Sequence, residues 1–172
     1  DQLRQVVTSL REKAIIELMY VYARRPSEII YLNMSDIDMN GGTIKFNILK
    51  KDEPFRATFK LRDDARQVLQ DYFRYRVDQT IEAEMPWEED EVRPVFTTNQ
   101  GRISYDTVWR NIKQLANKAG IEKNITPKSM RHSRSTHLDW AGQSPEIIAR
   151  QQLVHNPESD TIGHYIHPRD ED

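Results

Sequence analysis

The sequence of 172 residues contains no cysteine. Disulfide bonds, zinc sites built on thiolates and cysteine nucleophiles are therefore excluded. The absence of disulfides agrees with a protein of a reducing compartment, so we expect a cytoplasmic location.

Long apolar runs are also lacking. The longest, residues 14–23, is interrupted by Glu17 and is far shorter than the ~20 residues that cross a bilayer. No signal peptide is visible, so we expect no membrane attachment. Hydrophobic residues make up 37% and charged residues 30%, as in a folded globular protein. The chain starts at Asp1 and not at a methionine, from which we expect a piece of a longer protein.

An excess of positive charge is missing as well, because the formal net charge is −2 at pH 7. The distribution matters more than the sum, since a polyanion contacts a patch and not the whole surface. Acids are concentrated in residues 82–91 and 169–172, whereas residues 102–150 are mostly basic. The basic side chains of that stretch are Arg102, Arg110, Lys113, Lys118, Lys123, Lys128, Arg131, Arg134 and Arg150. The pattern permits a polyanion-binding face on an otherwise acidic body.

Helical periodicity of apolar residues dominates the chain. The expected helices cover residues 3–23 in two parts, 27–32, 63–75, 105–119, 127–140 and 145–153, with a short last piece at 160–167. Their boundaries follow from a break near Thr8-Ser9, from Pro26 at a helix start and from Ser104 as a cap. Gly120 and Gly142 are expected just after helix ends.

Two segments alternate like strands. Residues 43–49 and 55–61 are rich in β-formers and flank a polar turn at 50–54, which predicts a β-hairpin. Residues 79–92 are acidic and contain Pro86, and we expect an exposed loop there. The predicted fold class is therefore mainly α with a small antiparallel β-sheet (α+β).

Several polar residues are candidates for chemistry, although each has an ordinary explanation when taken alone. Arg24-Arg25 has the composition of a solvated pair, and Lys50-Lys51 that of a polar turn. Lys128, Arg131 and His132 would share about one turn of a helix, which is also typical of a salt-bridging surface. Their order along the chain is what distinguishes them.

The histidines near the end of the chain are weak candidates for a metal site. His155, His164 and His167 have no acid or further histidine at ligand spacing on a helix. We therefore expect no metal.

Read in order, the polar motifs resemble those of the tyrosine recombinase (integrase) family. Residues 25–29, Arg-Pro-Ser-Glu-Ile, resemble the family's arginine-x-serine-glutamate-leucine motif. In that family a β-hairpin with a catalytic lysine comes next, and here the hairpin turn carries Lys50-Lys51. Residues 126–132 then resemble threonine-proline-histidine-x-leucine-arginine-histidine.

Two further motifs complete the resemblance. Residues 153–155 are similar to the family's leucine-glycine-histidine, and Thr161, Tyr165 and His167 match its final threonine, tyrosine and histidine. The motifs follow the family order over residues 10–168, nearly the whole chain.

The sequence departs from the family pattern at three points. Lys128 stands where the family has a histidine, and Val154 where it has a glycine. Tyr165 follows His155 by ten positions, one more than is commonest in the family, so we expect a different turn at residues 156–163.

The resemblance implies a tyrosine recombinase catalytic-domain fold over residues 1–172, with the family's N-terminal DNA-binding domain absent from this chain. It implies that Tyr165 attacks a DNA phosphodiester and forms a covalent 3′-phosphotyrosine, without cofactor or metal. Arg25 and Arg131 would clamp the phosphate oxygens, because the planar guanidinium binds two oxygens at once. His155 would be a third donor.

Two lysine roles follow from the same resemblance. Lys51 is the expected general acid for the leaving 5′-oxygen, and Lys50 is the alternative, since alternation places their side chains on opposite faces. Lys128 either acts as a base, if neighbouring cations lower its pKa, or adds only a hydrogen bond and a charge. The second role is simpler.

The implied partner is double-stranded DNA, bound by a homotetramer on two sites in the full-length protein and by a monomer in this isolated domain. Seven residues follow Tyr165, so we expect the family's exchanged C-terminal segment to be absent or truncated. Tyr165 need not be docked in the isolated domain. An archaeal virus or plasmid is the expected source of such an integrase.

Three other functions compete with this interpretation. The first is a degenerate, non-cleaving DNA-binding module of the same fold, which the filled arginine, lysine and tyrosine positions disfavour. The second is a helical regulator whose residues 128–134 read DNA. The third is a metal-dependent nuclease, which would need carboxylates clustered in the interior.

Overall fold

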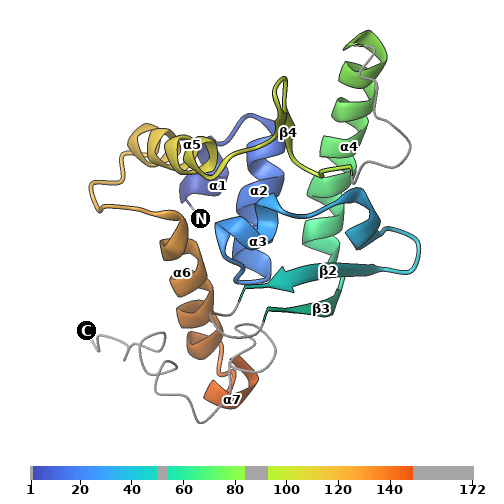
Figure 1. Ribbon diagram of the computed structural model, residues 1–172. Helices are drawn as coiled ribbons and strands as arrows, with labels where there is room; N and C mark the ends of the chain where they lie inside the picture. The colour runs from blue at the N-terminus through green and yellow to red at the C-terminus, as the bar shows by residue number, and fades with distance from the viewer. Residues whose placement is uncertain (1, 50–53, 84–92, 149–172) are drawn as a thin grey trace.

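The computed structural model describes residues 2–49, 54–83 and 93–148 (Figure 1). Its helices are α1 (Gln2–Val6), α2 (Leu10–Val21), α3 (Pro26–Ile30), α4 (Asp63–Ala83), α5 (Tyr105–Lys118), α6 (Pro127–Trp140) and α7 (Pro145–Ile147), with a 3₁₀ turn at Met34–Asp36. The strands are β1 (Ile37–Asp38), β2 (Thr43–Ile48), β3 (Phe55–Lys60), β4 (Thr97–Thr98) and β5 (Gly101–Arg102). The predicted α+β class, mainly helical with a small antiparallel sheet, is confirmed.

Helix α2 forms the centre of the core. Ser9 caps it, with its Oγ accepting the Glu12 N–H at 3.4 Å, and nearly every residue from 14 to 21 is buried. A helix that is apolar on all sides is typical of a central position. Its one buried acid, Glu17, accepts two hydrogen bonds from Arg4 of α1, at 2.5 and 2.8 Å.

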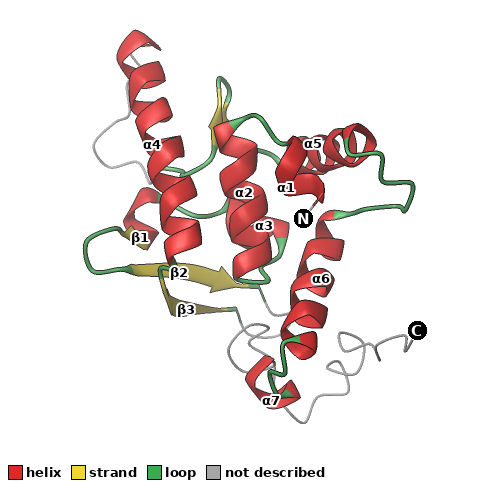
Figure 2. Cartoon of the chain, turned by 180° about the vertical axis from the view of Figure 1, so that it is seen from behind, coloured by secondary structure: helices red, strands yellow, loops and turns green. Residues whose placement is uncertain are grey.

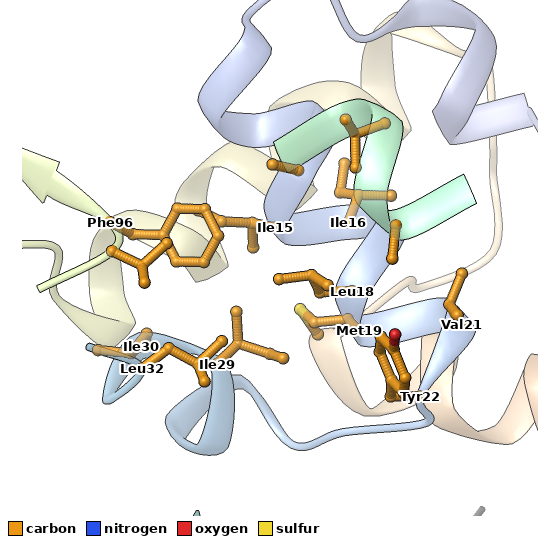
Figure 3. Close-up of a cluster of buried hydrophobic side chains, with 14 of the residues drawn as sticks. Ile15, Ile16, Leu18, Met19, Val21, Tyr22, Ile29, Ile30, Leu32 and Phe96 are labelled. Carbon is orange, nitrogen blue, oxygen red and sulfur yellow. The ribbon is translucent and has the colours of Figure 1, made fainter. Parts of the chain in front are cut away.

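The elements that follow α2 pack around it. Figure 3 shows Ile15 and Leu18 of α2 facing Ile29 of α3, with the ring of Phe96 beside them. Helices α4 and α6 pack against α2 from different sides, so that α2 and α3 lie between them (Figures 1 and 2).

The hairpin is attached to the end of α2 by aromatic rings. Strands β1, β2 and β3 are antiparallel in that order, and Ile44, Phe46 and Ile48 point from β2 into the core. The Tyr22 ring lies 5.2 Å from Phe46, and its hydroxyl donates to the Lys60 carbonyl at 3.0 Å. These contacts hold the sheet beside the connection between α2 and α3.

Most of the predicted boundaries are confirmed. The break before α2, the start of α3 at Pro26, the Ser104 cap of α5 and the start of α6 at Pro127 all agree with the sequence analysis. Such ends depend on local capping groups, which a sequence displays directly.

Two predictions need correction. The expected loop from residue 79 is wrong over residues 79–83, because α4 continues to Ala83. Acidic charge alone does not end a helix, and residues 77–83 contain no proline or glycine. Strand β1 was not expected, since two residues are too short to show alternation.

The predicted turn at 50–53, the loop at 84–92, and the helical segments beyond residue 148 lie outside the described residues. Among the residues that the structure does describe, no helix has the length and apolar character needed to cross a membrane.

A partly buried hydrogen bond joins α2 and α6. The Tyr20 hydroxyl and the His137 Nδ1 are 2.7 Å apart, and their rings meet edge to face. Burial lowers the pKa of His137 below its ordinary value, and the nearby Arg134 guanidinium lowers it further. The folded state therefore favours the neutral ring.

This contact predicts a loss of stability at acidic pH. With its folded pKa depressed, His137 binds a proton more readily when unfolded, so the free energy of unfolding falls as pH drops through about 6.5. Urea unfolding at pH 7.5 and 5.5 should show a smaller loss for His137→Gln than for the unsubstituted protein. Equal losses in the two proteins would contradict this assignment.

Candidate active site

The connection between α2 and α3 carries the first site residue. Ala23 has a φ of +50°, a left-handed conformation that turns the chain sharply after α2. Arg25 follows in an extended conformation as the N-cap residue of α3, and Pro26 fills the first helical position. The Arg25 side chain remains 38% exposed, so its guanidinium is accessible at the surface.

A buried carboxylate organises this connection. Glu28 is 1% exposed and accepts the Arg25 backbone N–H at 2.9 Å and the Arg25 guanidinium at 3.0 Å. Its Oε1 also accepts the Leu49 N–H at 3.2 Å. Leu49 is the residue before the Lys50-Lys51 pair, so Glu28 fastens the end of β2 to the arginine motif.

Arg131 reaches the same connection from α6. Its side chain is 2% exposed, and its Nη1 donates to the Ala23 carbonyl at 2.9 Å. Figure 1 shows α6 running past α3 at this point. Arg131 of α6 thus bonds the carbonyl of the residue two positions before Arg25, so the short segment that begins at Ala23 links the elements that carry the two predicted clamp residues.

Lys128 lies in the first turn of α6, one helical turn before Arg131, and is exposed. The turn is capped by Thr126 and Ser129, whose Oγ accepts the Thr126 N–H at 3.1 Å. The position suits a solvated cation beside the clamp. The remaining predicted residues, Lys51, His155 and Tyr165, lie outside the described residues.

The Arg24-Arg25 pair is not the solvated pair that its composition favours. Arg24 is 0% exposed, its Nε donates to the Tyr22 carbonyl at 2.6 Å, and its guanidinium lies 5.0 Å from the Phe59 ring. Burial lowers the pKa of Arg24 to about 9; Glu28 opposes this shift. The sequence analysis did not predict that Arg24 is buried beside Arg25. Its position directly after the apolar run 14–23 was the feature of the sequence that indicated burial.

One member of the basic stretch also needs correction. Arg102 donates to the Ile30 and Leu32 carbonyls at 2.8 and 3.1 Å and to the Asn33 Oδ1 at 2.6 Å. These bonds hold β5 to the end of α3 and leave Arg102 engaged in the fold. Its first role is therefore structural.

Within residues 2–49, 54–83 and 93–148, no group of three or more histidine, aspartate or glutamate side chains is placed to hold a metal ion. The described charges of the site are the guanidinium groups of Arg24, Arg25 and Arg131 and the carboxylate of Glu28, with Lys128 nearby. Such an arrangement suits an oxyanion ligand, because fixed cations and N–H donors stabilise negative charge.

The chain is similar to known proteins over nearly its whole length. The family model described as the phage integrase family matches residues 1–172. Tyrosine recombinase XerD of Oceanobacillus iheyensis is 31% identical over 160 residues, which cover 92% of this chain and 50% of that protein. Tyrosine recombinase XerC of Thermodesulfovibrio yellowstonii is 31% identical over 161 residues, covering 93% and 51%. The chain therefore spans about half the length of these relatives.

Solved structures share the fold. The crystal structure of XerA recombinase matches with a TM-score of 0.76 at 24% identity, covering 98% of this chain and 58% of that one. A lambda integrase (75-356) dimer bound to a COC′ core site matches with a TM-score of 0.69 at 14% identity, covering 99% and 58%.

The Glu28 contacts predict a large effect of a small substitution. Glu28→Gln keeps the shape of the side chain but replaces a carboxylate oxygen with an NH2 group, which then faces the N–H donors of Arg25 and Leu49. We expect the free energy of unfolding to fall by about 2–4 kcal/mol. Urea unfolding measures the loss, and the Leu49 amide should exchange its hydrogen faster. Glu122→Gln, at an exposed position, is the matched control and should change stability by less than about 0.5 kcal/mol. Equal effects of the two substitutions would refute the role given to Glu28.

Proposed function

Because the chain belongs to the phage integrase family and has the catalytic-domain fold of the tyrosine recombinases, we propose that it cleaves and rejoins double-stranded DNA in site-specific recombination. The observation that carries this proposal is that Arg131 bonds the Ala23 carbonyl, two residues before Arg25, at a connection that Glu28 also ties to the end of β2. Residues 1–172 would be the catalytic domain of a longer recombinase, with the DNA-binding domain outside this chain.

Two structurally similar proteins are bound to DNA in their solved structures. One is a XerH site-specific recombinase bound to palindromic difH substrate, and another is the lambda integrase dimer on its core site. For this chain, accessible Arg25 and Lys128 would contact phosphate oxygens. We propose that the whole protein works as a homotetramer on two DNA sites inside the cell and that the isolated domain is a monomer.

The proposed reaction is a transesterification at phosphorus. The Tyr165 hydroxyl releases its proton to water, and its oxygen forms a bond to phosphorus while the bond from phosphorus to the 5′-oxygen breaks. A 3′-phosphotyrosine and, after protonation, a 5′-hydroxyl result. The pentacoordinate transition state carries more negative charge than the phosphodiester, and Arg25, Arg131 and His155 would stabilise it. Because the bond energy is kept in the phosphotyrosine, rejoining requires no ATP.

The lysines complete the proton transfers. Lys51 would donate a proton to the leaving 5′-oxygen, with Lys50 as the alternative. The Glu28 bond to Leu49, the residue that precedes the pair in the sequence, supports this proposal. Lys128 would add a charge and a hydrogen bond at the phosphate. Its exposed position in the first turn of α6 supports this role over that of a base.

The nucleophile can be tested directly. Tyr165→Phe should lose covalent attachment to a nicked suicide duplex, because phenylalanine has no oxygen to attack phosphorus, while DNA affinity should stay within about twofold. Denaturing electrophoresis detects the adduct, and adduct formation should survive a chelator such as EDTA.

The same assay separates this function from a DNA-binding module and from a metal-dependent nuclease. An adduct formed by Tyr165→Phe would refute the assignment of the nucleophile. DNA binding without any adduct in the unsubstituted protein would favour the degenerate DNA-binding module. Cleavage that stops in EDTA would favour a metal-dependent nuclease.

A change of leaving group can show which lysine is the general acid. Lys51→Ala should slow cleavage by on the order of 100-fold, and Lys50→Ala by much less. A substrate with sulfur at the scissile 5′ position should restore the rate of Lys51→Ala, since a thiolate leaves without a proton. The reverse order of the two variants would move the acid to Lys50, and failure of the sulfur substrate to restore either would refute a proton-donor role.

A further inference from the structure

Arg24 is a charged residue in an apolar place. It is 0% exposed, and its guanidinium lies over two rings of the hairpin, 5.0 Å from that of Phe59 and 5.9 Å from that of Phe46. Moving a guanidinium out of water is costly even with favourable partners, and apolar residues of similar size often serve such positions as well or better. A leucine or methionine would fill this space.

The electrostatic surroundings make the position more unfavourable. Arg24 is adjacent to Arg25 in the chain, and the Ala23 carbonyl on its other side receives Arg131. Both neighbouring guanidinium groups repel Arg24, and the carboxylate that attracts it is Glu28. Three positive charges against one negative give the cluster a formal net charge of +2, at a site with a low local dielectric.

That excess charge matches the reaction. A phosphodiester carries one negative charge, whereas its pentacoordinate transition state carries two. A fixed positive charge in a buried position acts over several ångströms, because little water lies between to screen it. Its stabilising effect is greater for the transition state than for bound DNA, which is the condition for faster cleavage.

We propose that Arg24 is a positioning residue of the phosphate clamp, which supplies a buried positive charge beneath Arg25 and Arg131 without touching DNA. Its contacts with the hairpin rings and the Tyr22 carbonyl hold that charge in place. This inference rests on the proposed DNA-cleaving function. It also explains why two consecutive arginines occur here with opposite exposure, one directed to the surface and one to the interior.

The test compares three substitutions in the purified chain. Arg24→Leu removes the charge and keeps the packing, and Arg24→Lys keeps the charge without the planar fork. Arg76→Leu is the matched control. Arg76 is a half-buried arginine of α4 that donates to the Pro94 and Val95 carbonyls at 2.6 and 2.9 Å, on the side of α2 away from α6 (Figure 1).

The readouts are the single-turnover rate of adduct formation at saturating protein and the melting temperature. Rates are measured on a nicked duplex with a normal scissile phosphodiester and on one with a methylphosphonate, whose uncharged methyl group replaces a non-bridging oxygen. The second substrate has one negative charge less in its transition state, so it depends less on a distant cation.

We expect Arg24→Leu to slow cleavage of the phosphodiester by on the order of 10- to 100-fold, and cleavage of the methylphosphonate by less than about threefold. Its melting temperature should be unchanged or higher, because a buried charge is replaced by an apolar group. Arg24→Lys should recover most of the rate. Arg76→Leu should lower the melting temperature. At temperatures where this variant is folded, both of its cleavage rates should be unchanged.

Three outcomes would overturn the inference. These are a phosphodiester rate for Arg24→Leu equal to that of the unsubstituted protein, an equal loss on both substrates, and a failure of Arg24→Leu to fold. The last would show that the charge serves the fold itself. If the unsubstituted chain forms no adduct on either substrate, the proposed function fails and takes this inference with it, a result separate from the first three.

Discussion

The buried carboxylate of Glu28 is the interaction on which the site depends. It neutralises part of the charge of Arg24 and Arg25, and it binds both the start of α3 and the end of β2. A buried guanidinium without such a partner would bear the full cost of losing its hydration, because arginine keeps its charge. Glu28 therefore allows positive charge to be concentrated at one point of a chain whose net charge is −2.

The left-handed turn at Ala23 is the second constraint. A residue with a β-carbon is strained at a φ of +50°, and a small side chain keeps that strain low. The turn directs successive residues to different surroundings, so that Arg24 enters the core and Arg25 faces outward. It also presents the Ala23 carbonyl to Arg131, which joins α6 to the arginine motif. One strained residue thus arranges three elements.

The site is built on rigid parts of the fold. The aromatic rings of Tyr22, Phe46 and Phe59 hold the hairpin against the end of α2, and the apolar surface of α2 supports α3. Catalytic groups held by a packed core need little rearrangement when a transition state forms. The polar contacts around Glu28 would be weak in water, but they are strong here because the core excludes water from them.

The sequence by itself determined the local features: helix starts at Ser9, Pro26 and Ser104, the hairpin, and the order of motifs that resembles the tyrosine recombinases. These follow from capping groups and from periodicity, which act over a few residues. It could not tell where α4 ends, because no helix-stopping residue marks the position, nor reveal a strand as short as β1.

Only the tertiary structure decided what each arginine does. Four arginines carry the same guanidinium group in different surroundings. Arg24 is buried against aromatic rings, and Arg25 is accessible at the surface. Arg102 bonds the Ile30 carbonyl at the end of α3, and Arg131 bonds the Ala23 carbonyl from α6. The long guanidinium side chain finds its partners among residues that are distant in sequence. Burial and partners therefore depend on how α2, α3, α6 and the hairpin pack together, which no local pattern records.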